Sequence, residues 1–268
     1  ALNSLGTLGG GNHFIEVGRD EKELFYVTVH SGSRHLGTEV SEFYLRAGQK
    51  MLKKAGVHNV PYEMTYLEEN LMEDYIHDVG VVQEYASLNR KIILEEILRG
   101  MKWKKEELFT SVHNCLEATE LDGKKFLMLR KGAVSAAKGQ RVLIPANMKD
   151  GILLGTGIGN EAWNCSAPHG TGRVMNRAEV KSHFTVSAFR KEMDGIYSSC
   201  IGQETLDEAP FAYRGLDEIA AAVSETVGVD RIIRPVYSFK AGSGYRSGRD
   251  KRGGRSELKK AYRDKRRK

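Results

Sequence analysis

The sequence has few cysteines and no long apolar run, and both absences exclude classes of protein. Its 268 residues include only Cys115, Cys165 and Cys200, too few for a disulfide-stapled secreted domain, so free thiols in a reducing compartment are expected. No stretch reaches the roughly 18 apolar residues that a membrane-spanning helix needs. The first residues contain neither a basic segment nor an apolar run, so no secretory signal is visible and we expect a cytoplasmic protein.

The chain also lacks internal repeats and linkers. No segment recurs at a fixed period, which excludes solenoid and propeller architectures. No Pro/Ser-rich stretch divides the chain before about residue 241, and a chain of this length can bury a large core without staples. We therefore expect one domain over residues 1–240 and a separate segment over residues 241–268.

The positive charge is concentrated in that final segment. The formal net charge is +6, but residues 241–268 alone contain 12 Lys/Arg and 3 Asp/Glu together with five glycines. The preceding 240 residues contain 29 basic and 32 acidic side chains. Two interpretations of 241–268 stay open: a solvated terminus without a specific role, or an attachment to RNA phosphates that includes a short basic helix over 255–268.

Secondary-structure signals occur in clusters. FYVTVH (25–30) alternates as a strand does and ends at small polar residues. A helix is expected over 62–106, with Asn89 and Arg90 as polar breaks in its apolar face and Gly100 as its stop. Short strands and glycine turns follow over 107–175, and a second helix is expected over 214–226. Clustered strands favour an α+β fold with sandwich-like sheets flanked by helices.

Four of the eight histidines lie in short, polar, glycine-bounded segments: His13, His30, His113 and His169. A histidine at a strand end can point a ring nitrogen into a pocket built from loops, and imidazole binds Mn, Fe, Cu or Zn. A single such histidine is more often structural, and the spacing matches no compact zinc motif. A metal site and structural roles therefore both stay open.

His169 has neighbours that suit phosphate chemistry. It precedes Gly170-Thr171-Gly172, where the backbone can approach phosphate oxygens, and Arg173 and Arg177 follow four residues apart. A neutral imidazole nitrogen can attack phosphorus and form a covalent phosphoramidate. The alternative is a tight turn that starts a helix. GTLGGGNHF is not a Walker A loop, because it lacks the Gly-Lys-Ser/Thr sequence.

Seven segments, taken together, resemble the RtcB family of GTP- and manganese-dependent RNA ligases. They occur in the family's order, span about 240 residues, and are SLGTLGGGNHFIEV (4–17), HSGSRHLG (30–37), HNCLE (113–117), RKGAVSAAKGQ (130–140), IPANM (144–148), SAPHGTGRVMNR (166–177) and RPVYSFKAG (234–242). Any one segment is a weak signal, but seven in series are highly specific. Ala146, Asn147 and Thr171 depart from the family's usual residues and indicate a divergent subgroup.

The resemblance implies a role for each matching residue. His169 would be the nucleophile that attacks the α-phosphate of GTP and carries GMP. The metal ligands would be His13, His30 and His113, and Arg34, Arg173 and Arg177 would hold RNA or nucleotide phosphates. The guanylate pocket would be lined by Asn12, His13, Phe14, Ile15, Glu16, His113, Asn114, Pro145, Ala146, Asn147, Met148, His169, Gly170, Thr171, Gly172 and Lys240.

The resemblance also implies the reaction and its partners. GMP would pass from His169 to an RNA 3′-phosphate, and attack by a 5′-hydroxyl end would then join the two RNAs and release GMP, in RNA repair or tRNA splicing. A 2′,3′-cyclic phosphate end would first be opened. The cofactors would be GTP as co-substrate and Mn²⁺, with two ions in a complete protein. The sequence does not indicate whether the reaction needs an accessory protein.

One departure from the family concerns the metal site. The family also uses an Asp and a bridging Cys upstream of the first matching segment, and no Asp-x-x-Cys occurs in this sequence. If the chain is a fragment, the activity belongs to the longer protein. If it is complete, a catalytically impaired protein that binds RNA ends is the main alternative. A metal-dependent phosphatase acting on RNA ends is a weaker one.

Overall fold

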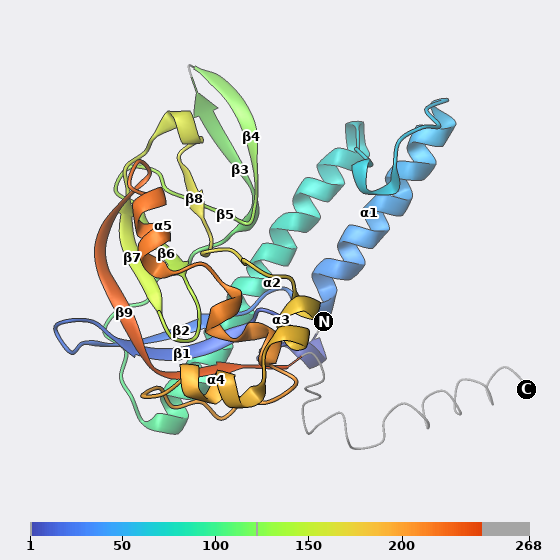
Figure 1. The fold of residues 1–268 in the computed structure, drawn as a ribbon. Coiled ribbons are helices and arrows are strands. Elements are labelled where there is room, and N and C mark those ends of the chain that lie inside the picture. Colours follow the sequence, from blue (N-terminus) through green and yellow to red (C-terminus); the bar gives the residue numbers. More distant parts are fainter. Residues whose placement is uncertain (1, 122, 243–268) are drawn as a thin grey trace, which may run out of the picture.

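Antiparallel strands from both ends of the chain form the central sheet of the molecule (Figure 1). The structure is a computed structural model and describes residues 2–121 and 123–242, so most of the basic segment 241–268 lies outside the described residues. The described strands are β1 (Phe14–Arg19), β2 (Phe25–His30), β3 (Asn114–Leu121), β4 (Lys124–Lys131), β5 (Ala133–Ser135), β6 (Arg141–Pro145), β7 (Ile152–Gly157), β8 (Ser166–Pro168) and β9 (Val227–Lys240).

The helices are a long pair and several short ones. The described α-helices are α1 (Arg34–Lys54), α2 (Glu69–Met101), α3 (Arg177–His183), α4 (Val186–Glu192) and α5 (Leu216–Ala222). Single 3₁₀ turns lie at η1 (Leu2–Ser4), η2 (Tyr62–Met64), η3 (Glu161–Trp163), η4 (Leu206–Glu208) and η5 (Pro210–Ala212). None of the described helices is long and apolar enough to cross a membrane.

The main sheet has the order β2-β1-β9-β7-β6, and β3–β4 and β5–β8 form two small sheets beside it. The long strand β9 pairs with β1 along one part and with β7 along another. The β1–β9 register places Phe14 opposite Lys240 and Glu16 opposite Ser238. Because side chains on one face recur every second residue, these four residues share one face of the sheet. This architecture confirms the α+β class.

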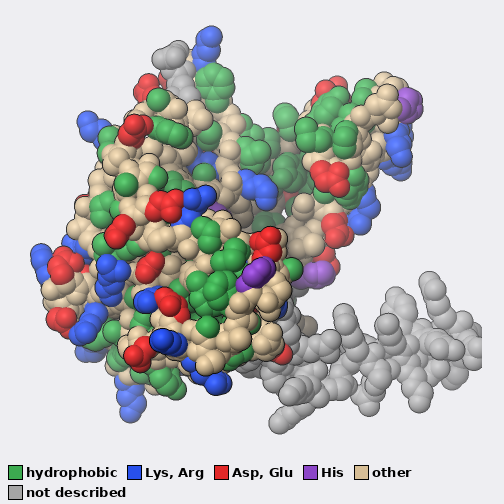
Figure 2. Space-filling view, in the orientation of Figure 1, with side chains coloured by type: hydrophobic (Ala, Val, Ile, Leu, Met, Phe, Trp, Pro, Cys, Tyr) green, Lys and Arg blue, Asp and Glu red, His purple; other side chains and the backbone are tan. Residues whose placement is uncertain are grey.

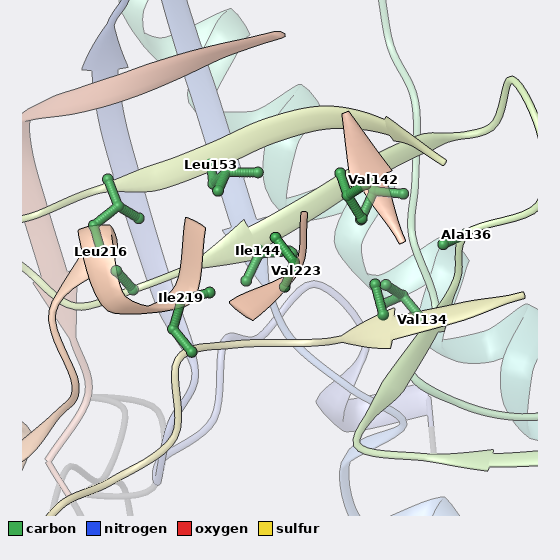
Figure 3. Close-up of a cluster of buried hydrophobic side chains, with 11 residues drawn as sticks. Val134, Ala136, Val142, Ile144, Leu153, Leu216, Ile219 and Val223 are labelled. Carbon is green, nitrogen blue, oxygen red and sulfur yellow. The ribbon is translucent and has the colours of Figure 1, made fainter. Parts of the chain in front are cut away.

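The hydrophobic core covers both faces of β7. On one face, Leu153 joins the cluster drawn in Figure 3, which β6, β7 and α5 build together with the β5 segment. On the other face, Ile152 and Leu154 pack with Phe14 and Ile233. Burial on both faces explains why the sequence of β7 begins as an uninterrupted apolar run rather than an alternating one.

Helices α1 and α2 form an antiparallel arm that extends away from the sheet (Figure 1). The predicted helix over 62–106 is confirmed as α2, although it begins later and ends at Met101, where Lys102 takes the left-handed cap conformation. The predicted helix over 214–226 is shorter and spans Leu216–Ala222. Tyr44 of α1 donates to Asp78 Oδ2 of α2 at 2.8 Å, and burial together with this bond raises the pKa of Tyr44 to about 12.

Asn89 explains the polar break in the apolar face of α2. Its side chain is completely buried, and its Oδ1 accepts from the backbone N–H groups of Gly6 and Thr7 at 2.7 and 3.2 Å. Its Nδ2 donates to Thr7 O and to Ser31 Oγ at 3.2 and 3.0 Å. One amide therefore joins α2 to the glycine-rich loop before β1 and to the segment after β2.

We expect Asn89→Ala to destabilise the protein by about 3 kcal/mol, because it leaves buried backbone groups without partners. Glu84→Ala, at an exposed position of the same helix, is the control and should change the free energy of unfolding by less than about 0.5 kcal/mol. Denaturant unfolding of both variants measures the difference. Equal losses in the two variants would contradict the role of Asn89.

Candidate functional site

The structure brings together the four histidines that the sequence singled out. His13 directly precedes β1, His30 ends β2, His113 directly precedes β3, and His169 directly follows β8. Their rings form a continuous row, with centroid separations of 5.7 Å from His13 to His30, 5.2 Å from His30 to His113 and 4.4 Å from His113 to His169. Four segments far apart in the chain therefore meet at one place.

Three of these rings are uncharged at neutral pH. Burial, followed by the neighbouring histidines, lowers the pKa of His30 to about 3, and burial lowers that of His113 to about 4. Burial and the nearby Arg34 guanidinium also lower the pKa of His13. The Nδ1 atoms of His13 and His113 are buried and have no hydrogen-bond partner. Neutral imidazoles with free lone pairs are the form that binds a metal ion.

The four histidine rings do not converge on one point in this structure. Among residues 2–121 and 123–242, no three His, Cys, Asp or Glu side chains gather closely enough to hold a metal ion. The rings of His30, His113 and His169 stack instead of converging on one point. The assignment of His13, His30 and His113 as ligands therefore stays a prediction.

His169 is held in one tautomer by the backbone. Its Nδ1 lies 2.7 Å from the carbonyl oxygen of Gly132. Because a carbonyl only accepts, Nδ1 must carry the proton, and in the neutral ring the lone pair is then on Nε2. Gly132 also donates its N–H to His113 O at 2.7 Å, so it links two of the four histidines. The arrangement leaves Nε2 as a potential nucleophile.

Gly132 can make these contacts because it has no side chain. Its φ is +69°, a conformation that L-residues rarely adopt, and a Cβ there would lie 3.4 Å from His169 Cε1. Gly9 similarly leaves room for the side chain of Arg34. A Cβ at Gly9, whose φ is +82°, would overlap the Arg34 guanidinium, which therefore lies directly on the loop backbone beside His13.

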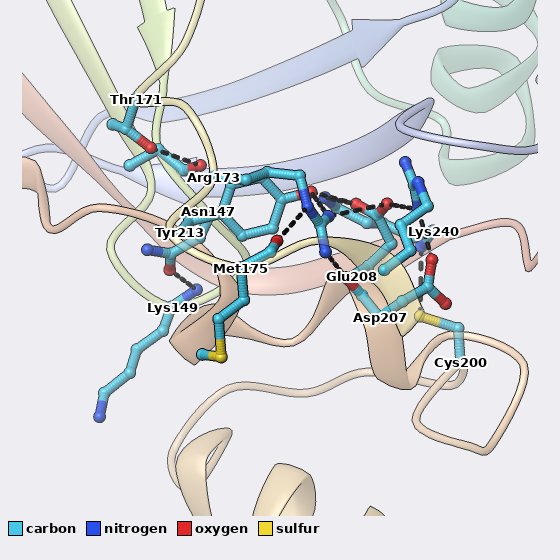
Figure 4. A network of polar contacts seen from close by, with 12 residues as sticks. Asn147, Lys149, Thr171, Arg173, Met175, Cys200, Asp207, Glu208, Tyr213 and Lys240 are labelled. Atoms are coloured by element: carbon cyan, nitrogen blue, oxygen red, sulfur yellow. Dashed lines mark hydrogen bonds and ion pairs between the residues drawn. The ribbon is translucent and has the colours of Figure 1, made fainter. Parts of the chain in front are cut away.

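A second group of charged side chains surrounds Glu208 in η4 (Figure 4). Its carboxylate is only 3% exposed, and its Oε2 accepts from Lys240 Nζ at 2.7 Å and from Tyr213 OH at 2.5 Å. Arg177 forms an ion pair with Oε1. Burial opposes ionisation, but Lys240 and these hydrogen bonds outweigh it and hold the pKa of Glu208 below its usual value. Glu208 therefore holds the Lys240 side chain in position through a buried ion pair.

Two of the three predicted phosphate-binding arginines, Arg173 and Arg177, already have partners within the protein. Arg173 donates to Met175 O, Tyr213 OH and Asp207 O, and its guanidinium lies 4.9 Å from the Tyr213 ring centroid. Arg177 pairs with the buried carboxylates of Asp207 and Glu208. Both arginines therefore stabilise η4, and of the three predicted phosphate contacts only Arg34 lies against the histidine row.

The face shared by Phe14, Glu16, Ser238 and Lys240 forms a buried polar position on the sheet. The Lys240 ammonium lies 5.9 Å from the Phe14 ring centroid and 5.0 Å from that of Tyr213. Glu16 Oε1 and Ser238 Oγ are buried without a hydrogen-bond partner. Burial raises the pKa of Glu16 to about 8, with Lys240 opposing the rise. Because buried polar atoms are nearly always hydrogen-bonded in proteins, these two oxygens are candidates to bind a ligand, a water molecule or an ion.

The remaining predicted pocket residues belong to neighbouring loops. Thr171 Oγ1 donates to Ala146 O at 3.3 Å, so the loop after His169 contacts the loop between β6 and β7. Asn147 uses its amide within its own loop, where Oδ1 accepts from two backbone N–H groups. Met148 is buried in a second core cluster rather than directed at the histidines. The other predicted residues lie as follows: Asn12 and Asn114 are exposed, Ile15 is half-buried in β1, Pro145 ends β6, and Gly170 and Gly172 flank Thr171.

Sequence reasoning missed Gly132, Glu208 and Tyr213 as parts of this site. Gly132 occurs in the segment RKGAVSAAKGQ, where its position in a matching motif was a usable signal. Glu208 and Tyr213 lie in a stretch without helical or strand periodicity. They belong to the site only because β9 brings Lys240 next to them. A contact between segments so far apart in the chain leaves no local sequence pattern.

We expect Gly132→Ala to disturb the His169 tautomer, because an alanine resists φ of +69° and a shift of this backbone moves the carbonyl oxygen that accepts from Nδ1. Long-range ¹H–¹⁵N spectra of the wild-type ring should show a protonated Nδ1 and an unprotonated Nε2, and the variant should show a mixture. Gly56→Ala is the matched control, since its φ is +79° and nothing lies within 4 Å of the added Cβ. A wild-type His169 spectrum in Gly132→Ala would contradict this role.

Comparisons with known proteins agree with the resemblance found in the sequence. The family model for tRNA-splicing ligase RtcB matches residues 1–241. The chain is 32% identical to the RNA-splicing ligase RtcB of Escherichia coli K12, over 88% of this chain and 61% of that protein. It is also 32% identical to the tRNA-splicing ligase RtcB of Aeropyrum pernix, over 87% of this chain and 58% of that protein. The chain thus spans about three fifths of the length of these curated relatives. It belongs to the tRNA-splicing ligase RtcB family.

Proposed function

We propose that the protein of which this chain is part, or the whole, ligates RNA through a guanylylated His169. The observation that carries the proposal is the hydrogen bond from His169 Nδ1 to Gly132 O, which leaves Nε2 with the lone pair of a nucleophile. Membership of the RtcB family supports RNA as the substrate. The ends joined are a 3′-phosphate, or a 2′,3′-cyclic phosphate after opening, and a 5′-hydroxyl.

The chemistry has three balanced steps. His169 Nε2 attacks the α-phosphorus of GTP, forming a P–N bond as the bond to pyrophosphate breaks. An oxygen of the RNA 3′-phosphate then attacks the same phosphorus, so that the P–N bond breaks and GMP is carried by the RNA end. Finally the 5′-hydroxyl attacks the 3′-phosphate phosphorus, loses its proton and displaces GMP.

The shared face of β1 and β9 suits the guanine base. Guanine offers N–H donors along one edge and a carbonyl acceptor beside them. Glu16 Oε1 and Ser238 Oγ are buried acceptors without partners, and the Lys240 ammonium is a fixed donor close by. The rings of Phe14 and Tyr213 lie on Lys240 and supply apolar surface. These groups support a guanylate pocket at this position.

Neutral imidazole nitrogens can bind a divalent transition-metal ion, and the resemblance to the RtcB family implies that this ion is Mn²⁺. The rings of His13, His30 and His113 are uncharged and half-buried, and the Nδ1 atoms of His13 and His113 are buried without a partner. His13, His30 and His113 would hold the ion, which when bound would neutralise charge on the phosphates. Arg34 lies beside His13, and this position supports a contact from its guanidinium to a phosphate of GTP or RNA.

A protein that binds RNA ends without catalysis is the second candidate. It is favoured by the engaged state of Arg173 and Arg177, whose donors are used by η4 and its neighbours. It is also favoured by the stacking of the histidines, since no metal-binding group of three is found in the described residues. The guanylylation experiment separates the two candidates.

Incubation with GTP labelled at the α-phosphate and Mn²⁺ should label the protein covalently, with the acid lability of a phosphoramidate. His169→Ala should abolish the label, because no other group replaces Nε2. His183→Ala, at an exposed histidine of α3, is the control and should keep it. Binding of 3′-phosphorylated RNA without any label would favour the non-catalytic candidate instead.

Glu208→Gln should weaken GTP binding by about tenfold, because the amide no longer neutralises the buried ammonium group of Lys240. The half-saturating GTP concentration for labelling should rise, while the rate at saturating GTP changes less. Glu218→Gln removes an exposed i,i+4 partner of Arg214 and is the matched control. A lower melting temperature with unchanged GTP dependence would assign Glu208 a structural role only.

A further inference from the structure

A basic groove runs along the outer face of the arm, far from the histidine row. It is an open surface depression of about 630 Å³ between α1 and the segment around η2, lined by Arg46, Gln49, Lys50, Lys53, Lys54 and Tyr62. Four of its six lining residues carry a positive charge. In Figure 2, Lys and Arg side chains gather along the outer edge of the arm, where α1 lies.

The lysines of this groove are not neutralised by neighbouring carboxylates. Arg46 lies 3.4 Å from Glu42, one turn earlier in α1, with both side chains exposed. Within the described part of the chain, Lys50, Lys53 and Lys54 form no ion pair. Three unpaired ammonium groups within about one and a half helical turns repel one another, and a polyanion would relieve that repulsion.

The opposite wall of the groove is held in place by hydrogen bonds. Gln49 Nε2 donates to Thr65 Oγ1 at 2.8 Å and to Val60 O at 3.2 Å. Thr65 Oγ1 in turn donates to Tyr62 O at 2.6 Å. These bonds tie the η2 segment to α1 and leave the Tyr62 side chain 42% exposed at the groove. An exposed aromatic ring beside a basic groove is the combination that binds single-stranded nucleic acid.

The groove is connected to the site by α1 itself. Arg34 begins the helix beside His13. At 1.5 Å per residue, Arg46 lies roughly 18 Å and Lys54 roughly 30 Å further along the helix axis. A strand whose end lies at His169 therefore needs several nucleotides to reach the lysines.

We propose that this groove binds the phosphodiester backbone of the RNA strand that extends away from the ligation site. The lysines would contact successive phosphates as point charges, and Tyr62 would stack on a base. The inference rests on the proposed function for the identity of the ligand. It adds a second RNA-binding surface, on the arm, that sets how long the strand must be for tight binding.

The test compares single-stranded 3′-phosphorylated RNAs of about 4 and about 16 nucleotides, the limits of typical single-strand site sizes. The variant carries Lys50→Gln, Lys53→Gln and Lys54→Gln. For the long RNA, the slope of log affinity against log salt should fall by about 2, at roughly 0.7 for each phosphate that the variant no longer neutralises. Affinity for the short RNA should stay as in the wild type. Tyr62→Ala should weaken long-RNA binding about tenfold.

The matched control carries Lys102→Gln, Lys104→Gln and Lys105→Gln, which remove the same charge at the other end of α2. An equal fall in slope in both triple variants, or in neither, would overturn the proposal. So would loss of binding to anionic phospholipid vesicles with unchanged RNA binding. Labelling of His169 by GTP, measured on the same samples, tests the proposed ligase mechanism separately from RNA binding by the groove. A selective loss of long-RNA binding without any labelling would retain the groove and reject the ligase mechanism.

Discussion

The antiparallel pairing of β9 with both β1 and β7 is the constraint on which the rest of the structure depends. Without β9 the main sheet would be two separate hairpins, β1–β2 and β6–β7. Its register with β1 places Lys240 against Phe14, and Phe14 stacks on His30 at 5.4 Å. A one-residue slip would move Lys240 to the opposite face of the sheet and away from Glu208. The last described strand therefore completes a site whose other residues come from much earlier in the chain.

Buried polar groups turn that framework into a defined site. Asn89 fixes the glycine-rich loop before His13, and the Gly132 carbonyl orients His169. Glu208 holds Lys240. These hydrogen bonds are wholly or partly buried, so a polar atom left without its partner costs more free energy than the intact bond contributes to folding. Such hydrogen bonds stabilise one arrangement of the loops rather than adding greatly to overall stability.

The sequence predicted those parts of the fold that local patterns encode. Alternation identified FYVTVH as a strand, and the apolar stripe identified α2. The histidine contexts placed four side chains at strand ends that do meet. Helix α1 was missed because the glycines within it lower helix propensity, although Tyr44, Gly48 and Leu52 keep helical spacing. The ion pair between Glu208 and Lys240 could not be predicted from the sequence, because it forms only when β9 brings Lys240 to η4.

The two ends of α1 operate under different electrostatic conditions. At the Arg34 end, burial lowers the pKa values of His30 and His113 and keeps their rings uncharged, so each ring retains a nitrogen lone pair. At the other end the lysines are exposed and unpaired, and the Debye length at physiological salt is about 8 Å. Because roughly 18–30 Å of helix separates them, the lysines cannot perturb the protonation of His30 or His113. Under the proposed function, a strand held on the arm would therefore raise the local concentration of RNA ends without altering the protonation of His30 or His113, and mutations at the two ends of α1 would change RNA binding and labelling of His169 independently.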